Sequence, residues 1–474
     1  MNCPIKNITM TYFIKTFGCQ MNVSDSERVS SFLESSGFDL AEKIEDSDLV
    51  ILNTCGVRQM AEDRVFGLVR NLKKDNPKIK IVVTGCLANR KDIHRRMKDV
   101  DLFTEIKDFR EKVSSILYQV FSMDSKIQDT KYEMQNTLHN KEHIGYLSIN
   151  PKYKNTFSAY VPIMTGCDNF CSYCVVPYAR GREVSRPAEE IVSEIKNLVA
   201  KGYKSITLLG QNVNSYCSSS KNSSADEADK KISFAKLLKK VDRIPGKFWI
   251  HFVSSHPKDM DSVAIETITK LKKVCENIHL PIQAGDDGVL RRMNRKYTQK
   301  HYLGLIRKIK TSFKKYKPDA PYSITTDIIV GFPGETKKQF GNSAMVMEKS
   351  KFDMVFFGQY SPRPGTAAWN MKDNVSIKEK EWREKSLNEI LKKTALANNK
   401  KYVGRKIEVL IEKEKDGPVK SGSPDHGIKF YFGKTRTLKN VKLLSDRKNL
   451  VGKIVKAEIT KANIWSLEAC LPKR

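Results

Sequence analysis

Long hydrophobic runs are missing from this sequence. Its 474 residues contain no stretch of about 20 apolar residues, and the mean hydropathy is −0.47. The first 22 residues also lack an apolar segment followed by a small-residue cleavage site. These absences exclude a membrane-embedded protein, and we expect a cytoplasmic protein without a membrane partner.

Cysteine is scarce as well. Ten cysteines in a chain of this length are too few for a disulfide scaffold, so in a reducing compartment a patterned subset would be metal ligands or catalytic thiols. Apolar residues make up 40% of the chain and aromatic residues 9%, which is enough to build cores and argues against wholesale disorder. The length predicts two to four globular domains.

Acidic residues are outnumbered by basic ones. The chain has 84 Lys and Arg against 54 Asp and Glu, a formal net charge of +30. Such a charge attracts polyanions through Coulomb steering and counterion release, so nucleic acid is the leading class of partner. A lysine-rich proteome encoded by an AT-rich genome is the alternative source of the same charge.

In the first part of the chain, three strand-like apolar runs each end in a cysteine. They are TYFIKTFGC, DLVILNTC and IKIVVTGC, which end at Cys19, Cys55 and Cys86. Helical patterns lie between them, which predicts a doubly wound parallel sheet whose strands bring their carboxyl ends to one crevice. Core cysteines are the alternative interpretation. Each of the three lies beyond its apolar run, in a polar or glycine context, which favours a shared site.

The rest of the chain divides by composition. Residues 10–123 form the predicted first domain, and the polar stretch 124–148 is a predicted linker. Six β-branched runs separated by helical patterns predict a partial (βα)6 barrel in residues 149–400, interrupted by a polar insertion at 217–231 that we expect to be a mobile loop. Four short alternating strands predict a small OB-like β-barrel in residues 401–474, and they lie at 406–413, 428–435, 453–460 and 464–469. The fold class is therefore α/β with a small C-terminal barrel.

The sharpest motif is a CxxxCxxC run that directly follows the first predicted barrel strand. Cys167, Cys171 and Cys174 place three thiolates within eight residues, which indicates a metal. A structural zinc ion takes four protein ligands, and no fourth cysteine or histidine follows at finger spacing. Three sulfurs more naturally hold a [4Fe-4S] cluster with one iron left open for another ligand. Structural zinc, or cysteines without metal, is the alternative.

This motif, with an aromatic residue before its last cysteine, is similar to that of the radical S-adenosylmethionine superfamily. The resemblance implies that the open iron chelates S-adenosylmethionine and that one electron from the cluster cleaves it to a 5′-deoxyadenosyl radical. It places Tyr173 near the adenine. Gly331 and Gly334, in GFPGE after a strand, resemble the adenosine-contacting turn of that superfamily. Gln211, Asn212 and the stretch 254–256 lie at strand ends that face the predicted barrel mouth.

Together with the N-terminal cysteines, the motif resembles the methylthiotransferase family, whose members join a three-cysteine domain, a radical barrel and an RNA-binding TRAM barrel. The resemblance covers essentially the whole chain and is closest to the branch that acts on isopentenylated adenosine in tRNA. The stretches that carry it are 16–22, 52–55, 85–86, 166–187, 209–214, 254–257, 279–283 and 331–335.

The resemblance implies a second [4Fe-4S] cluster on Cys19, Cys55 and Cys86, from which sulfur is delivered. All six cysteines would then be metal ligands and catalytic. One S-adenosylmethionine would methylate the sulfur, and a second would be cleaved to the radical that activates carbon 2 of N6-isopentenyladenosine at position 37. An unactivated aromatic C–H bond needs such a radical generator and a sulfur carrier. The partners implied are the tRNA anticodon stem-loop and an electron donor such as flavodoxin or ferredoxin, and we expect a monomer.

Two alternatives remain at this point. The substrate could be threonylcarbamoyladenosine in tRNA or an aspartate of a ribosomal protein, although the basic charge favours RNA. The chain could also be a non-catalytic RNA-binding protein with a structural metal centre.

Several other residues are less informative. Arg180, Arg182 and Arg186 could meet a phosphate or pair with structural acids. The C-terminal segment carries a net charge of +10 and offers aromatic residues for base stacking. These candidates are Tyr431, Phe432 and Trp465. The cysteines without a matching spacing are expected to be non-ligands, namely Cys3, Cys217, Cys275 and Cys470.

Overall fold

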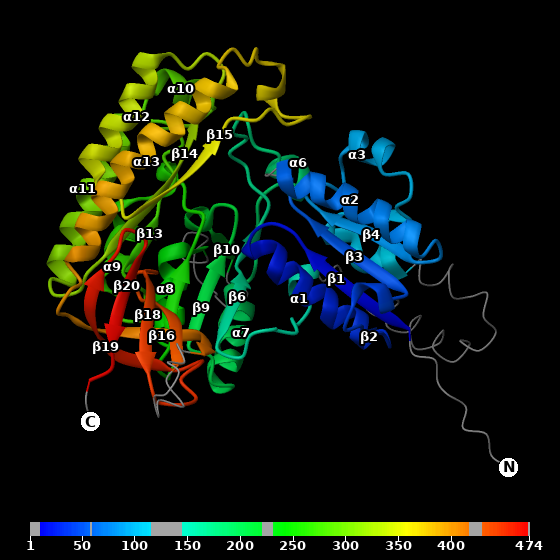
Figure 1. Ribbon diagram of the computed structural model, residues 1–474, viewed down its shortest axis with the longest axis horizontal. Helices are drawn as coiled ribbons and strands as arrows, with labels where there is room; N and C mark the ends of the chain where they lie inside the picture. Colours follow the sequence, from blue (N-terminus) through cyan, green and yellow to red (C-terminus); the bar gives the residue numbers. More distant parts are fainter. Residues whose placement is uncertain (1–9, 57–58, 115–144, 220–230, 417–428, 473–474) are drawn as a thin grey trace, which may run out of the picture.

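The computed structural model describes residues 10–56, 59–114, 145–219, 231–416 and 429–472. Figure 1 shows a barrel-like body, a separate N-terminal domain beside it and a small C-terminal barrel beneath it. Within the described ranges, no helix is both long and apolar enough to cross a membrane.

The N-terminal domain is a five-stranded parallel sheet with helices on both faces. Its strand order is β2-β1-β3-β4-β5, and all of its strand pairs are parallel. One core lies on the α1 side and contains Tyr12 and Ile51, and the other contains Val50 and Val83. β3 is buried on both faces, as expected of a central parallel strand. The doubly wound prediction is confirmed. The elements are β1 Thr11–Thr16, α1 Gln20–Ser35, β2 Asp39–Leu40, β3 Leu49–Thr54, α2 Gln59–Asp75, β4 Lys80–Gly85, α3 Lys91–Arg96 and β5 Leu102–Phe103.

The middle of the chain is a partial barrel of six parallel strands, as predicted. Two three-stranded sheets, β12-β9-β6 and β13-β14-β15, are joined by a parallel bridge between Ile250 and Val274. Its strands are β6 Ser158–Pro162, β9 Ser205–Leu209, β12 Trp249–Phe252, β13 Asn277–His279, β14 Ser323–Val330 and β15 Met354–Gln359. The helices are α6 Val176–Arg180, α7 Ala188–Ala200, α8 Phe234–Asp242, α9 Ser262–Lys270, α10 Asp287–Arg292, α11 Gln299–Tyr316, α12 Lys337–Ser350 and α13 Ile377–Lys400. The short strands β7 Met164–Thr165 and β8 Val184–Ser185 pair beside the cysteine loop.

The structure describes only the ends of the predicted insertion, 217–231, and the end of the predicted linker, 124–148. The insertion is anchored by a short hairpin of β10 Cys217–Ser219 and β11 Lys231–Ser233, so its ends are paired strands and not loop, while 220–230 lie outside the described residues. At the end of the predicted linker, Tyr146 and Leu147 are buried in the N-terminal core. The remainder of the linker, 124–144, lies outside the described residues.

The C-terminal segment is a closed five-stranded barrel, β16-β17-β18-β20-β19. The sequence indicated four of its strands and missed β18, although Val441 and Leu443 alternate into the core there. Tyr431 is fully buried in that core and donates a hydrogen bond to the Arg447 carbonyl at 2.7 Å, so it is not available for base stacking. Trp465 is 41% exposed. The strands are β16 Lys406–Asp416, β17 Lys429–Thr435, β18 Asn440–Ser445, β19 Ile454–Ala462 and β20 Ser466–Cys470.

This small barrel covers the amino-terminal ends of the radical-barrel strands. At the seam, Trp249, Cys275 and Leu410 form a buried apolar cluster. The Arg436 guanidinium bonds the Glu276 carboxylate at 2.8 Å, and the Ser323 hydroxyl donates to the Thr437 carbonyl at 2.8 Å. Cys275 is therefore a packing residue of the seam.

Candidate active site

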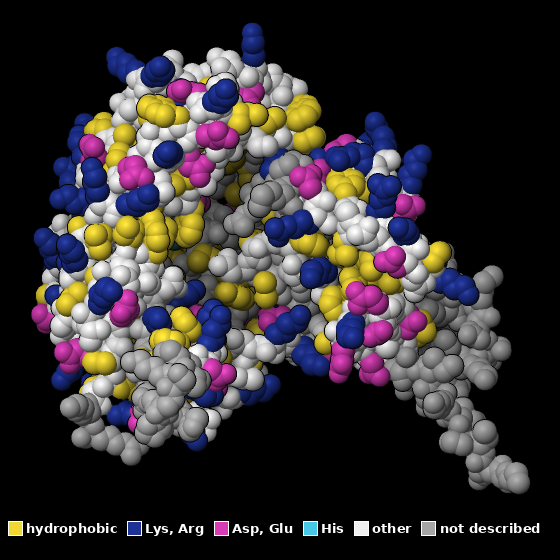
Figure 2. Space-filling model, in the orientation of Figure 1, with side chains coloured by type: hydrophobic (Ala, Val, Ile, Leu, Met, Phe, Trp, Pro, Cys, Tyr) yellow, Lys and Arg dark blue, Asp and Glu magenta, His cyan; other side chains and the backbone are white. Residues whose placement is uncertain are grey.

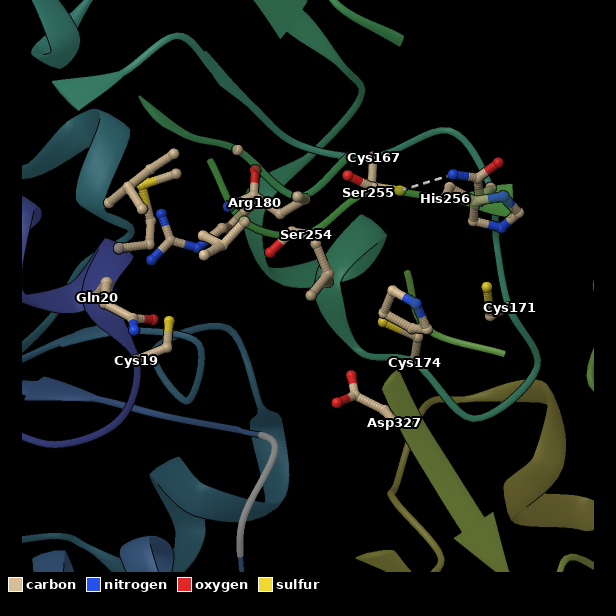
Figure 3. Close-up of a pocket in the computed structure, with 18 of the residues that line it drawn as sticks. Cys19, Gln20, Cys167, Cys171, Cys174, Arg180, Ser254, Ser255, His256 and Asp327 are labelled. Carbon is tan, nitrogen blue, oxygen red and sulfur yellow. Dashed lines mark hydrogen bonds between the residues drawn. The ribbon is translucent and has the colours of Figure 1, made fainter. Parts of the chain in front are cut away.

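All six cysteines of the two sequence triads line one cavity of about 390 Å³, where the N-terminal domain meets the mouth of the barrel. Figure 2 shows the molecule hollowed between these two parts. In Figure 3, Cys19 lies at the start of α1, while Cys167, Cys171 and Cys174 lie on the loop from the barrel. Side chains far apart in sequence thus meet at the carboxyl ends of parallel strands, where α/β folds place their ligands.

The N-terminal triad is assembled by close packing of three strand ends. Gly18 has a φ of 119°, and a Cβ there would lie 2.6 Å from the Cβ of Cys55, so only glycine allows the Cys19 turn to approach. Cys19 then begins α1, and its thiol lies 3.2 Å from the Asn22 side-chain oxygen. The buried Asn22 amide donates to the Thr54 carbonyl at 2.9 Å, which ties α1 to the end of β3.

The second triad lies on a loop clamped from two sides. The Cys167 amide donates to the Gly181 carbonyl at 3.2 Å and the Cys174 amide donates to the Cys171 carbonyl at 2.9 Å. After α10, the Met293 carbonyl accepts from the Ser172 amide at 3.0 Å. The loop is thereby fixed by backbone contacts, independently of any metal.

The thiols of Cys167 and Cys174 are neutral when no metal is bound. Burial, together with the nearby Cys171, raises the pKa of the Cys174 thiol to about 12. Burial also raises the pKa of Cys167. Because the thiolate is the metal ligand, binding of a metal here must release protons.

The donor set of each triad, three thiols, matches the cysteine ligands of an iron–sulfur cluster. Among the described residues, no three cysteine, histidine or carboxylate side chains converge as the ligands of one metal ion would. Three thiols facing a shared cavity suit a cluster whose cysteines bind at separate corners.

The cavity also holds buried polar atoms that fit an amino-acid and nucleoside ligand. Within the described part of the chain, the Gln211 side-chain oxygen, the Ser255 hydroxyl and the His256 Nε2 have no hydrogen-bond partner. His256 Nδ1 accepts from the Lys258 amide at 3.1 Å, which leaves the proton on Nε2, and burial lowers the pKa of the imidazole to about 2. A neutral ring with a free N–H therefore faces the cavity. Three such groups on the wall of one cavity are what a ligand with its own donors and acceptors would satisfy.

The predicted cofactor-binding residues separate into two groups. Tyr173 and Gln211 line the cavity. Asn212 lies behind the cavity wall and donates to Asp259 at 2.7 Å. The Gly331 amide donates to the Glu335 carboxylate at 2.6 Å, and the Gly334 amide donates to the Asn374 side-chain oxygen at 2.8 Å. The structure therefore does not bring Asn212, Gly331 or Gly334 to the cavity, and their cofactor role stays a prediction.

The three arginines after the motif pair with acids. Arg180 bonds Asp25 at 2.7 Å in a buried contact between the two domains, and it also lines the cavity. Arg182 pairs with Asp168 at 2.9 Å and Arg186 with Glu194 at 2.8 Å. These pairs match the structural alternative given for them above.

Four further residues that line the cavity were not predicted as site residues, although His279 and Gln283 lie at the two ends of the stretch 279–283 that carries the family resemblance. Asp327 lies within β14, and the His279 ring bonds the Thr325 hydroxyl at 2.9 Å. Gln283 has a φ of 69°, a backbone conformation that is uncommon for residues other than glycine. Arg295 contacts the cysteine loop directly. The available signal was weak: Asp327 is a single acid in the apolar run ITTDIIV, and the others follow strand or helix ends.

Comparison with known proteins agrees with this arrangement. Residues 11–105 match the family model described as "Uncharacterized protein family UPF0004", and residues 161–345 match the "Radical SAM superfamily". A radical S-adenosylmethionine methyltransferase from Kitasatospora setae, solved with tryptophan and a cofactor analogue, has a TM-score of 0.51 at 12% identity. The matched region covers 86% of this chain and 79% of the methyltransferase chain. At that identity the likeness concerns the fold alone.

Relatives of known name match almost the full length. The tRNA-2-methylthio-N(6)-dimethylallyladenosine synthase of Thermoanaerobacter pseudethanolicus is 39% identical over 98% of this chain and 93% of its own. The synthase of the same name from Clostridium botulinum strain Hall is 39% identical over 98% of both chains, and that of Finegoldia magna is 40% identical over 96% and 93%. The chain therefore belongs to the family of tRNA-2-methylthio-N(6)-dimethylallyladenosine synthases.

Proposed function

We propose that this enzyme replaces the hydrogen on carbon 2 of N6-isopentenyladenosine at position 37 of tRNA by a methylthio group. The observation that carries the proposal is the single cavity lined by both cysteine triads. The names of relatives that match over nearly the whole chain support the choice of substrate.

In this proposal each triad holds one [4Fe-4S] cluster. Cys167, Cys171 and Cys174 would hold the cluster that binds S-adenosylmethionine, and Cys19, Cys55 and Cys86 the sulfur-delivering cluster. When bound, the clusters and S-adenosylmethionine supply a radical generator and a sulfur carrier, which acid and base chemistry cannot replace at an aromatic C–H bond.

The protein's own groups position the reactants. The His256 Nε2–H and the unpartnered oxygen of Gln211 offer a donor and an acceptor to the amino-acid and nucleoside parts of the cofactor. Tyr173, which lines the cavity, meets Phe332 edge to face at a centroid distance of 6.4 Å and so adds an apolar wall to the cavity. Such a wall excludes water from the place where a radical would form.

The RNA must present an exposed base to this cavity. Carbon 2 of the target adenine must enter a cavity lined by both triads, which a base stacked inside a helix cannot do. We expect the target adenosine to be splayed out of the anticodon loop, as single-stranded loops allow. Flavodoxin or ferredoxin as electron donor, a monomeric state and a cytoplasmic location belong to the same proposal.

The test is a product assay. The anaerobically reconstituted protein is incubated with S-adenosylmethionine, a reductant and either isopentenylated or threonylcarbamoylated tRNA, and the digested nucleosides are weighed by mass spectrometry. A methylthio gain on isopentenyladenosine alone is expected. A gain only on threonylcarbamoyladenosine, or no gain despite full iron loading, would overturn the proposed substrate.

A further inference from the structure

Arg295 is a buried arginine without a carboxylate partner among the described residues. Arg295 is only 8% exposed, and it lines the cavity. Four other buried arginines each contact an acid at 2.7 to 3.2 Å. They are Arg28, Arg180, Arg186 and Arg383. A buried guanidinium without a counter-ion is costly, so its position calls for an anion in the assembled site.

The guanidinium points at a cysteine of the radical motif. One terminal nitrogen of Arg295 lies 3.3 Å from the Cys171 sulfur and donates to it. The other terminal nitrogen donates to the Pro281 carbonyl at 3.1 Å, and Nε donates to the Tyr297 hydroxyl at 2.9 Å. Three directions of the fork are thus occupied, and the one toward Cys171 ends on a cysteine of the radical motif.

The local fold holds this arrangement in place. Asn294 follows α10 in the left-handed conformation with a φ of 55°, and the Arg295 amide donates back to the Leu290 carbonyl at 2.8 Å, as in a Schellman turn. The Asn294 side-chain amide donates to the Phe170 carbonyl at 2.8 Å. The turn that carries Arg295 is therefore also hydrogen-bonded to the cysteine loop.

We propose that Arg295 is the counter-ion of the cluster on Cys167, Cys171 and Cys174 and raises its reduction potential. This inference rests on the cluster assignment of the proposed function. A donor and positive charge next to a ligand sulfur favour the more negative, reduced state of a cluster. Arg295 acts through Cys171, and its role is to make the one-electron reduction by the external donor easier.

The experiment measures the midpoint potential of this cluster by an EPR-monitored redox titration. The full chain carries Cys19→Ala, Cys55→Ala and Cys86→Ala, so that the signal arises from the second triad alone. Arg295 is then changed to Gln or Lys. Arg291→Gln is the matched control, because it removes the same charge from an exposed position at the end of the same helix.

We expect Arg295→Gln to lower the potential, Arg295→Lys to restore part of the shift, and Arg291→Gln to leave it unchanged. In the iron-free protein, Arg295→Gln should not lower the melting temperature, because it removes a buried charge that has no counter-ion. A merely structural arginine would show the opposite pattern, with a lower melting temperature and an unchanged potential.

Other outcomes separate the inference from the proposed function. Equal potentials for Arg295→Gln and Arg291→Gln would overturn the inference. An unchanged potential with weaker S-adenosylmethionine binding would also overturn it and would assign the guanidinium to the cofactor carboxylate. If the three-alanine chain with Arg295 intact binds no iron, the cluster assignment itself fails.

Discussion

At the scale of single residues, the surroundings of each sulfur decide what a cysteine can do. Cys55 and Cys86 are buried at strand ends that face the cavity, whereas Cys275 is buried in an apolar seam and Cys217 is exposed on a hairpin. Burial alone therefore does not distinguish a proposed ligand from a packing residue. The distinguishing feature is a position at the carboxyl end of a parallel strand, which the sequence pattern already indicated.

Iron content tests this distinction. Cys86→Ala or Cys174→Ala is expected to remove one of two clusters and so about half of the bound iron, whereas Cys217→Ala should leave iron content unchanged. Colorimetric iron and sulfide assays on anaerobically reconstituted protein measure the difference. Complete loss of iron from either single substitution would contradict two independent sites.

Glu27 gives a prediction for pH. It is 4% exposed, one of its oxygens has no hydrogen-bond partner among the described residues, and burial raises its pKa to about 7. The unfolded value is about 4.3. Because the folded pKa is the higher one, the protonated carboxyl stabilises the fold below about pH 4, and this contribution is lost as the pH rises through 7.

We therefore expect Glu27→Gln to remove a pH dependence of up to about 3 kcal/mol between pH 4 and 8. Urea unfolding at several pH values measures it. Glu34→Gln is the control, since Glu34 is more exposed and pairs with Lys152 at 2.7 Å. Parallel pH profiles for wild type and Glu27→Gln would contradict this assignment.

At the scale of helices and strands, the sequence predicted the elements best where a run of apolar residues was long and uninterrupted. All six barrel strands and the three cysteine-capped strands lie where apolar runs indicated them. β18 was missed because its short alternation follows a turn, and Tyr431 was misassigned because a closed barrel turns alternate aromatics inward. The GFPGE turn was placed at the right strand end, but its polar groups bond α13 and its neighbours and do not face the cavity.

The contact between α1 and α6 sets how the two triads face each other. α1 begins just after Cys19 and α6 just after Cys174, and the buried Asp25–Arg180 pair joins them at 2.7 Å. No sequence pattern pairs residues 155 positions apart, so this contact could not be predicted.

Breaking this pair should therefore cost both stability and turnover. Arg180→Met leaves Asp25 buried and uncompensated, which costs about 3 to 5 kcal/mol. Chemical denaturation measures this loss. The double variant Asp25→Leu, Arg180→Met should recover most of the stability without recovering turnover, and equal stability of the single and double variants would contradict the argument.

At the scale of the whole molecule, the order of three domains followed from composition and motifs, but their mutual placement did not. Figure 2 shows Lys and Arg side chains spread over both the barrel and the N-terminal domain. A net charge of +30 spread in this way predicts that several RNA phosphates contact Lys and Arg side chains over a wide surface.

The salt dependence of tRNA affinity tests whether these phosphate contacts exist. If about four phosphates are neutralised, raising salt from about 50 to 200 mM should weaken tRNA binding roughly 100-fold, with a linear plot of log affinity against log salt. Filter binding or fluorescence anisotropy gives the slope. A flat plot would show that the positive charge has another cause, such as genome composition.

The C-terminal barrel has a consequence for the order of events during turnover. By packing Leu410 against Trp249 and Arg436 against Glu276, it covers the end of the radical barrel that lies opposite the cavity. In the proposed function, the cofactor and the RNA would both reach the cavity from the side of the domain cleft, so we expect S-adenosylmethionine to bind before the RNA.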